Sequence, residues 1–270
     1  MPETVGLIGA GRMGLPILGH VVRAGFTVIA HDVDPEKRTA VQAKGGRWAE
    51  RVTDLAEHTD FILICVGFDR EVQELLAPGG GLSRAKPGTI VAILSTIHPH
   101  TVQKLAADTK GRGVHVVDST VCRGGAAADE GTLLSFVGGA QDVVARLTPV
   151  LRAYSSDIVH CGDVGTAQVA KAVNNLILWA CLVADHEGLA LAQRYKVDVE
   201  ALRRALLISS ATNGALENWG NQTMAWAQDD MAIVGAMADD CGISLPQAGV
   251  VREICRTLKP RRYRLEQYGQ

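Results

Sequence analysis

The sequence predicts an α/β protein: a Rossmann-type, doubly wound sheet domain followed by an all-helical C-terminal domain. Three observations support this prediction. Short apolar runs alternate with helical patterns up to about residue 160, a glycine motif separates the first run from the first helical pattern, and strand patterns disappear from the remainder of the chain. We therefore predict a dinucleotide-binding domain at 1–162 and a helical domain at 163–270.

The first half contains six runs with the composition of strands. The runs at 61–66 and 90–94 are continuously apolar and end at polar or glycine residues, as expected of strands that are buried on both faces. Alternation of such runs with helices favours a mainly parallel sheet. The predicted strands are 5–8, 27–30, 61–66, 90–94, 114–118 and 134–137.

The character of the chain changes after Gly165. Residues 166–195 are rich in Ala, Leu and Val and contain no proline, which predicts one helix of about 45 Å. Further helical patterns follow at 199–207, 225–241 and 246–258. No strand pattern interrupts them, so the second domain is predicted to be wholly helical.

Composition and charge narrow the class of protein. The chain has 270 residues, with 27 Lys and Arg against 29 Asp and Glu, and its basic residues are scattered, which argues against a nucleic-acid partner. Its apolar runs are strand-sized, and its start does not resemble a secretory signal, so we expect a cytoplasmic protein without a membrane partner. Six cysteines without CxxC pairs predict reduced thiols and no metal site.

A glycine motif, Gly9-Ala10-Gly11-Arg12-Met13-Gly14, follows the first predicted strand and opens the first predicted helix. In a GxGxxG loop the first glycine permits a tight turn, the second lets the backbone approach a pyrophosphate, and the third allows close packing of helix on strand. The free N–H groups of the helix N-terminus favour a bound phosphate. The motif predicts a dinucleotide cofactor, although a glycine turn without a ligand has the same pattern.

Asp32 strengthens this prediction. It ends the second predicted strand, 21 residues after Gly11, where an acidic side chain can accept hydrogen bonds from the ribose hydroxyls of NAD and repel the 2′-phosphate of NADP. Val33 and Asp34 bring no arginine to that phosphate. The sequence therefore favours NAD, while a plain turn residue before Pro35 is the alternative.

A second motif, Asp118-Ser119-Thr120-Val121-Cys122-Arg123-Gly124-Gly125, lies at the carboxyl end of a predicted strand, where open α/β sheets bind ligands. Gly124 would let a backbone N–H approach a substrate carboxylate, and Arg123 could bind that carboxylate bidentately. A flexible surface loop with a solvated arginine is the alternative.

The third motif runs from Gly162 to Asn175. Lys171 and Asn175 are four residues apart and share one helical face. Uncharged residues surround the lysine, and because burial disfavours the charged form of an amine, such a lysine suits general acid–base catalysis. A lysine that extends along the helix edge to solvent is the alternative.

These three motifs, in this order, resemble the β-hydroxyacid dehydrogenase family, which includes 3-hydroxyisobutyrate dehydrogenases within the 6-phosphogluconate dehydrogenase superfamily. The family pattern GxIGxGxMGxPMAxxLxxxG is similar to residues 6–25, DAPVSGG followed by GTL to residues 118–133, and GxxGxGxxxKxxNN to residues 162–175, where Ala167 replaces a glycine.

The resemblance implies roles for individual residues. Lys171 would be the catalytic acid–base and Asn175 would orient a small carboxylic acid substrate. The segments Cys65-Val66 and Ser95-Thr96 would line the cofactor groove, with Thr96 near the nicotinamide. Substrate contacts would come from Cys122, Arg123, Gly124 and Asn175. The resemblance also implies a homodimer or homotetramer.

Departures from the family pattern leave two alternatives open. Cys122 and Arg123 replace a serine and a glycine, and Asp229 stands where the family carries a lysine. Either Arg123 supplies the missing cation as the carboxylate anchor, or the substrate is larger or less acidic than hydroxyisobutyrate. One alternative is an imine reductase of the same superfamily, which would generally lack the lysine. The other is a catalytically silent NAD-binding regulatory protein.

Overall fold

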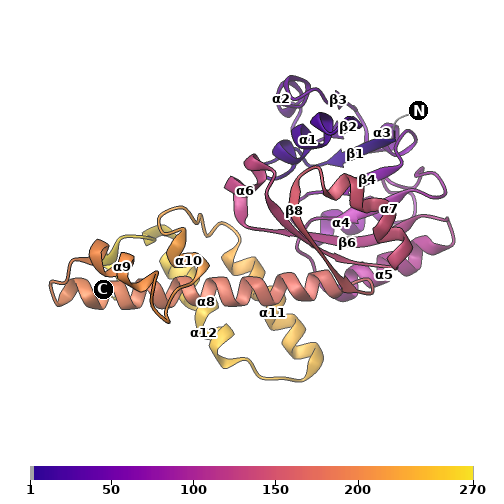
Figure 1. Ribbon diagram of the computed structural model, residues 1–270. Helices are drawn as coiled ribbons and strands as arrows, with labels where there is room; N and C mark the ends of the chain where they lie inside the picture. Colours follow the sequence, from indigo (N-terminus) through magenta and orange to yellow (C-terminus); the bar gives the residue numbers. More distant parts are fainter. Residues whose placement is uncertain (1–2, 270) are drawn as a thin grey trace. The chain divides into compact units, whose positions relative to one another are not determined.

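The computed structural model describes residues 3–269 and contains two compact units that divide between Lys171 and Ala172 (Figure 1). The first unit is an eight-stranded sheet with helices, and the second is helical. This is the Rossmann-type sheet followed by a helical region that the sequence predicts. The predicted boundary near residue 162 precedes the first turn of the long helix, whereas the division between the units follows that turn.

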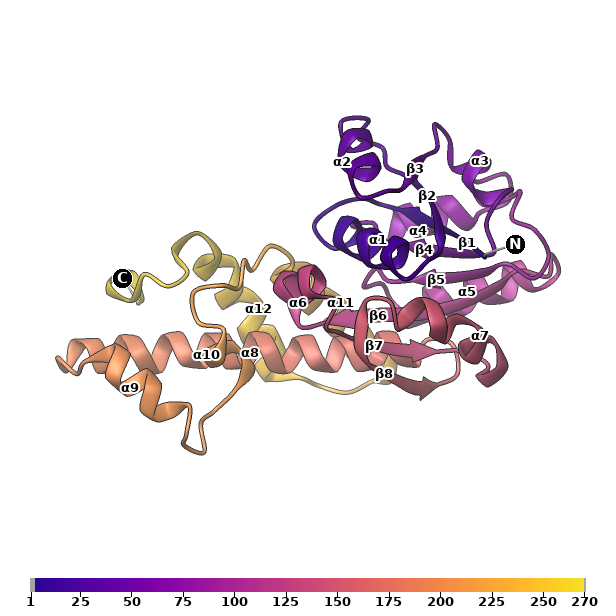
Figure 2. The ribbon, with the colours of Figure 1, turned by 45° about the horizontal axis from the view of Figure 1, so that its top comes forward.

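The sheet has the strand order β3-β2-β1-β4-β5-β6-β7-β8, which can be followed from top to bottom in Figure 2. All neighbouring strands are parallel except β6 and β7, which are antiparallel. The strands are β1 Thr4–Ile8, β2 Thr27–His31, β3 Arg47–Trp48, β4 Phe61–Ile64, β5 Ile90–Ile93, β6 His115–Cys122, β7 Leu133–Gly138 and β8 Ser155–Gly162.

Helices cover both faces of this sheet. Alternate residues of the central strands enter different apolar cores: Phe61 and Leu63 pack with α1, α6 and α7, whereas Ile62 and Ile64 pack with α3, α4 and α5. Burial on both faces explains why β4 and β5 are apolar throughout. The helices are α1 Gly14–Arg23, α2 Lys37–Ala43, α3 Val52–Ala56, α4 Asp69–Leu76, α5 Pro99–Lys110, α6 Gly124–Glu130 and α7 Gln141–Leu151.

The second unit is built around the long helix α8, Thr166–Arg194, whose first turn belongs to the first unit. Its core joins Trp179 and Leu182 of α8 to Met231 and Val251 of later helices. The remaining elements are α9 Val199–Leu206, α10 Gly214–Glu217, α11 Ala227–Cys241, α12 Pro246–Leu258, and the 3₁₀ helices η1 Lys259–Arg261 and η2 Leu265–Gln267.

Helix α8 is long and apolar enough, by length and composition, to cross a membrane. The individual apolar runs of the sequence are only strand-sized, but helix α8 as a whole is apolar over a membrane-spanning length. The core helix of a soluble protein passes the same test, and Leu182 and Leu189 of α8 are buried against other helices of the second unit. Hydropathy alone does not distinguish the two environments.

Candidate active site

The three motif glycines occupy three different steric environments at the carboxyl end of β1. Gly9 has φ +95°, and a Cβ atom there would lie 2.3 Å from the carbonyl oxygen of Cys65. A Cβ at Gly14 would lie 1.9 Å from the carbonyl oxygen of Gly9, whereas a Cβ at Gly11 would meet no atom within 4 Å. Gly9 and Gly14 are thus required by the protein itself, and the open side of Gly11 leaves room for a ligand.

Asp32 is hydrogen-bonded directly to this loop. Its Oδ2 accepts from the backbone N–H of Ala10 at 2.7 Å, and its Oδ1 accepts from that of Asp34 at 2.9 Å. The carboxylate is half-buried at the end of β2, beside the loop that would contact a pyrophosphate. These residues fit a dinucleotide, with the phosphates against Gly9–Gly14 and the ribose against Asp32.

Arg12 is turned toward α6. Its guanidinium donates two hydrogen bonds to the carboxylate of Asp129, at 2.8 and 2.6 Å, and both side chains are exposed. The hydrogen bonds from Arg12 hold the pKa of Asp129 below its usual range. This pair joins the cofactor loop to the segment that follows the second motif. Asp129 gives no signal in the sequence, since it is one of two adjacent acidic residues at the end of a helix.

Ser95 connects the ends of β4 and β5. Its hydroxyl accepts from the backbone N–H of Val66 at 3.0 Å and lies 2.9 Å from the carbonyl oxygen of the same residue. Cys65 adjoins Gly9, and burial raises the pKa of its thiol to about 12, which keeps the thiol neutral. The structure therefore brings Cys65 and Val66 to the glycine loop and places the partly exposed Thr96 next to Ser95.

The first turn of α8 is attached to β6 by buried hydrogen bonds. The carboxylate of Asp118, which is fully buried, accepts from the backbone N–H groups of Gly165 at 2.8 Å and Gln168 at 2.9 Å. Burial raises the pKa of Asp118, and these two N–H donors act in the opposite direction. The hydroxyl of Thr120 donates to the carbonyl oxygen of Ala167 at 3.0 Å. Alternate residues of β6 thus hold the start of the helix.

This attachment places Lys171 beside the second motif. Its Nζ donates to the carbonyl oxygen of Val121 at 2.7 Å and lies 3.8 Å from Sγ of Cys122, which is buried. The lysine is half-buried rather than extended into solvent. Asn175 follows one turn later on α8, and its Oδ1 accepts from Nδ2 of Asn174 at 3.0 Å. The amine of Lys171 and the second motif, which the sequence predicts separately, are therefore in contact with each other.

Arg123, the residue expected to anchor the substrate, makes its hydrogen bonds near β8. The side chains of Asp118, Thr120 and Cys122 are directed toward α8, whereas Arg123 has φ +83° and its Nη1 contacts residues near β8. Those contacts are with the carbonyl oxygen of Thr132 at 3.0 Å, Oγ of Ser156 at 2.9 Å and Oδ2 of Asp157 at 2.7 Å. Arg123 follows the last residue of β6, and its left-handed backbone conformation ends the alternation of side chains along that strand.

Gly124 lies at the start of α6 with φ +74°, and a Cβ atom there would meet nothing within 4 Å. Its backbone is therefore open to a ligand. Asp229 lies in the second unit, exposed in the first turn of α11, while its neighbour Asp230 is buried and accepts from Nε1 of Trp179 at 2.9 Å.

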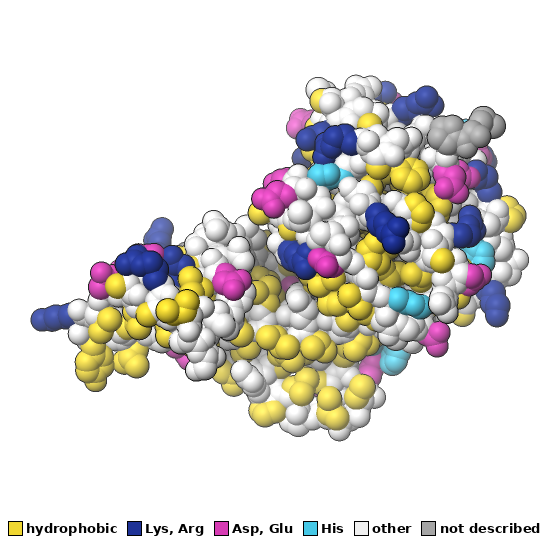
Figure 3. Space-filling view, in the orientation of Figure 1, with side chains coloured by type: hydrophobic (Ala, Val, Ile, Leu, Met, Phe, Trp, Pro, Cys, Tyr) yellow, Lys and Arg dark blue, Asp and Glu magenta, His cyan; other side chains and the backbone are white. Residues whose placement is uncertain are grey.

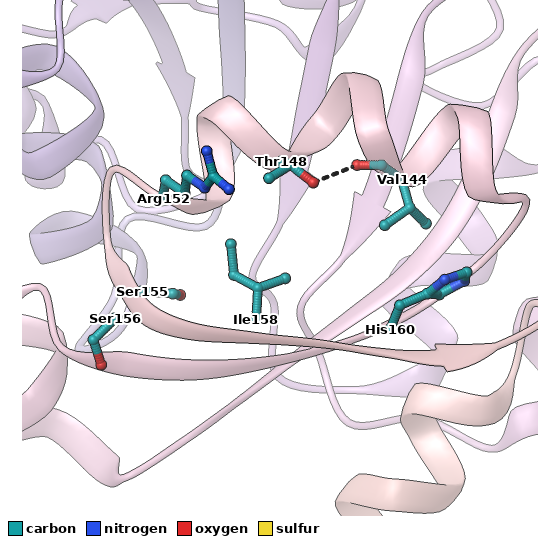
Figure 4. Close-up of a pocket in the computed structure, with 7 residues that line it drawn as sticks. All are labelled: Val144, Thr148, Arg152, Ser155, Ser156, Ile158 and His160. Carbon is teal, nitrogen blue, oxygen red and sulfur yellow. Dashed lines mark hydrogen bonds between the residues drawn. The ribbon is translucent and has the colours of Figure 1, made fainter.

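A hollow of about 350 Å³ lies elsewhere, between α7 and β8 (Figure 4). Its lining includes Thr148, Arg152 and His160, and the Thr148 hydroxyl donates to the carbonyl oxygen of Val144 at 2.8 Å. It contains none of the residues predicted for the active site. The His160 ring is used within the protein, because its Nε2 contacts the carbonyl oxygens of Gly139 and Gly162.

Each half of the chain matches a known protein family. Residues 4–162 match the NAD binding domain of 6-phosphogluconate dehydrogenase. Residues 165–267 match the family described as the NAD-binding region of NADP-dependent 3-hydroxyisobutyrate dehydrogenase. Together the two matches cover nearly the whole described chain.

Individual proteins show the same relationship. The chain is 30% identical to 3-hydroxyisobutyrate dehydrogenase of Pseudomonas aeruginosa, over 92% of this chain and 86% of that protein. It is 32% identical to 2-(hydroxymethyl)glutarate dehydrogenase of Eubacterium barkeri, over 79% of this chain and 71% of that protein. Among solved structures, 3-hydroxyisobutyrate dehydrogenase of Mycobacterium tuberculosis with L-serine matches with a TM-score of 0.86 and 22% identity, over 97% of this chain and 95% of that chain.

More distant structures share the fold alone. An imine reductase from Myxococcus stipitatus in complex with NADP⁺ matches with a TM-score of 0.70 and 18% identity, over 96% of this chain and 95% of that chain.

Proposed function

This chain belongs to the β-hydroxyacid dehydrogenase family, and we propose that it is an NAD-dependent oxidoreductase that interconverts a short β-hydroxy acid and its semialdehyde or keto form. The observation that carries this proposal is the position of Lys171, half-buried and 2.7 Å from the carbonyl oxygen of Val121 at the carboxyl end of β6. A lysine side chain at this place can exchange a proton with a substrate hydroxyl.

In the oxidation, the C–H and O–H bonds of the alcohol break and a C=O bond forms. The nicotinamide cofactor, when bound, accepts the hydride. Lys171, in its neutral form, takes the hydroxyl proton as the hydride leaves, and in the reverse reaction its ammonium returns that proton to the oxygen. The carbonyl of Val121 directs Nζ toward the end of β6. Asn175, one turn away, is proposed to orient the substrate.

Recognition of the substrate carboxylate is proposed for the turn after β6. The backbone N–H of Gly124 is the proposed donor, with the Cys122 thiol beside Lys171. We assign Arg123 to holding this turn against β8, since Thr132, Ser156 and Asp157 engage its Nη1. The substrate class proposed for this arrangement is a small carboxylic acid with a hydroxyl within reach of Nζ.

NAD is proposed as the preferred cofactor. Asp32 would accept hydrogen bonds from the ribose hydroxyls, and its negative charge would repel a 2′-phosphate. Ala10 and Asp34 already hold the carboxylate in place through their backbone N–H groups. Cys65, Val66 and Thr96 are proposed to line the groove toward the nicotinamide.

A homodimer or homotetramer is proposed for the assembled enzyme. Val169, Val173 and Ile177 of α8 repeat every four residues and are 41%, 50% and 57% exposed. Figure 3 shows hydrophobic side chains along the part of the surface where Figure 1 draws α8. Light scattering of Val173→Asp should report a smaller particle than the wild type. A wild-type monomer would contradict the proposal.

The location of the protein in the cytoplasm and the lack of a nucleic-acid partner are proposed from its composition. All six cysteines are free, which suits a cytoplasmic protein. A near-neutral net charge offers little to nucleic acid. Titration of freshly purified protein should therefore find six reactive thiols after unfolding, and a disulfide would argue for another compartment.

The central experiment follows NADH absorbance for the wild type and Lys171→Ala with a panel of β-hydroxy acids, β-hydroxy amino acids and cyclic imines. We expect the wild type to oxidise at least one β-hydroxy acid. The alanine variant should lose about 10²- to 10⁴-fold in kcat, the usual contribution of a general acid–base group. Its NADH affinity should stay within about twofold of the wild type, because Lys171 is not among the residues proposed to hold the dinucleotide.

Three other outcomes have distinct meanings. Reduction of imines without oxidation of any hydroxy acid would replace this proposal by the imine reductase alternative, which the fold also permits. NADH binding without any turnover would favour the silent regulatory protein. Undiminished activity of Lys171→Ala would remove the lysine from the mechanism.

A further inference from the structure

Gln168 is a fully buried amide whose two polar atoms are both used. Its Oε1 accepts from the backbone N–H of Ile97 at 3.0 Å, and its Nε2 donates to the carbonyl oxygen of Ser95 at 2.9 Å. These two partners flank Thr96. The Gln168 side chain of α8 is therefore hydrogen-bonded to the main chain on both sides of Thr96, the residue that is proposed to face the nicotinamide.

The same residue is held from the other side. Its backbone N–H donates to Asp118 of β6 at 2.9 Å, and it precedes Lys171 by three residues on α8. Ser95, in turn, binds Val66 through its hydroxyl. A continuous set of hydrogen bonds thus runs from the cofactor groove at Val66, through Ser95 and Gln168, to the helix that carries the lysine.

The chemistry of this position is restrictive. An N–H and a carbonyl oxygen, both from buried backbone, need a partner that accepts from one and donates to the other. A glutamine amide does both without charge. Asparagine is one methylene shorter, and glutamate offers two acceptors, one of which would face the carbonyl oxygen of Ser95. The length of the glutamine side chain therefore sets the spacing between the Thr96 segment and α8.

We propose that Gln168 is a positioning residue that fixes the Thr96 segment relative to Lys171, and so aligns hydride transfer with proton transfer. This inference rests on the proposed function, which assigns Thr96 to the nicotinamide side and Lys171 to the proton. Because the two transfers share one carbon–oxygen unit of the substrate, a displacement of about 1 Å can cost about 10²-fold in rate.

The test compares Gln168→Leu with Thr109→Val. The leucine removes both side-chain hydrogen bonds to the Thr96 segment at similar volume. The valine removes a fully buried hydrogen bond within α5, to the carbonyl oxygen of Leu105 at 2.8 Å, and leaves the hydrogen bonds of Gln168 in place. Gln168→Glu, which keeps an acceptor for Ile97 but loses the donor to Ser95, is the third variant. Each is assayed for kcat, KM, NADH affinity and the isotope effect with substrate deuterated at the transferred hydrogen.

We expect Gln168→Leu to lose about ten- to a hundredfold in kcat. Its NADH affinity and substrate KM should stay within about threefold of the wild type, and its isotope effect should rise because hydride transfer becomes slower than product release. Thr109→Val should lose no more than about threefold in kcat, and Gln168→Glu should resemble the leucine variant. Equal losses of kcat in the leucine and valine variants, or a loss confined to NADH affinity, would overturn the inference.

A second readout separates this inference from the proposed function. If the wild type oxidises no β-hydroxy acid, the proposed function fails, and the fluorescence lifetime of bound NADH decides the role of Gln168. A fixed nicotinamide gives one long lifetime, and Gln168→Leu should add a component close to that of free NADH while Thr109→Val does not. Identical lifetimes in the wild type and the leucine variant would then overturn the inference.

Discussion

The backbone N–H of Ala10 donates to Oδ2 of Asp32 at 2.7 Å, so the carboxylate at the end of β2 is bound to the loop between the first two motif glycines. The residue proposed to select the ribose therefore also holds the loop proposed to bind the pyrophosphate. Two functions depend on one side chain.

Replacement of Asp32 should affect both functions. In Asp32→Ala we expect the KM for NAD to rise at least about tenfold and the preference for NAD over NADP to shrink, because the acceptor and its charge are both lost. Asp32→Asn, which keeps one acceptor without the charge, should lose preference more than affinity. Ratios of kcat/KM for the two cofactors measure this, and an unchanged ratio in Asp32→Ala would exclude Asp32 from cofactor selection.

The substitutions Gly11→Ala and Gly14→Ala should impair different properties, cofactor binding in the first and stability in the second. At Gly14 the added Cβ would lie 1.9 Å from a backbone oxygen, so we expect a loss of stability of about 1–3 kcal/mol or more. At Gly11 the space is open, so the melting temperature should be unchanged while NADH affinity falls at least about tenfold. Thermal unfolding and NADH titration of both variants test this, and a destabilised Gly11→Ala would contradict the steric account.

Restoring the family serine in Cys122→Ser should improve substrate binding. A hydroxyl is a stronger hydrogen-bond donor than a thiol, so the KM for a β-hydroxy acid should fall about three- to tenfold. Cys161→Ser, on β8, serves as the control for removal of a thiol and should leave kinetics unchanged. A higher KM in Cys122→Ser would indicate that this enzyme uses the thiol for a substrate other than the one assayed.

Arg123→Ala should change KM by less than about threefold, because the guanidinium contacts Thr132, Ser156 and Asp157 rather than the lysine side of the turn. An exposed ion pair such as that with Asp157 contributes little to stability. Arg152→Ala removes a second exposed arginine from the same region and controls for net charge. A tenfold rise in KM specific to Arg123→Ala would restore its role as the carboxylate anchor.

His186 should make the stability of the helical unit depend on pH. Its Nδ1 contacts the carbonyl oxygen of Leu182 at 2.7 Å, and its Nε2 accepts from the backbone N–H of Tyr263 at 2.9 Å. Burial lowers the pKa of His186. The unfolded chain therefore takes up the proton first, and this contribution to stability is complete above about pH 6.5 and is lost as the pH falls toward the pKa of the folded state.

The matching variant is His186→Phe. It leaves the Tyr263 N–H and the Leu182 carbonyl without their side-chain partner and should cost about 1–3 kcal/mol at pH 7.5. Urea unfolding at pH 7.5 and 5.5 should show a smaller pH difference in the variant than in the wild type. Equal differences would mean that His186 does not titrate on unfolding.

The sheet could be predicted where burial made strands apolar. All six predicted strands are present, because β1, β2 and β4–β7 lie inside the sheet with both neighbours paired. The strand β8 was missed because it is the last strand of the sheet, and Ser156, Asp157 and His160 are exposed. A two-residue strand such as β3 has no periodicity to detect.

The site could be predicted where a motif is local. The glycine loop and the Lys171 helix each lie within one segment of sequence. The hydrogen bonds of Gln168, Asp118 and Ser95 could not be predicted, because their partners are 29 to 73 residues away in the sequence, and a separation of that kind leaves no periodic trace. Only Gln168 has a signal in the sequence, because it is a polar residue in an otherwise apolar helical turn with Ala167, Val169 and Ala170.

The contrast between Gly11 and Gly14 has a consequence for how this sequence can diverge. Position 14 is constrained by packing and would remain glycine in a descendant that had lost every ligand. Position 11 has no such constraint inside the protein, so only a cofactor would preserve it. A homologue that retains the fourteenth residue but carries a side chain at the eleventh would thus record the loss of dinucleotide binding, while its fold persisted.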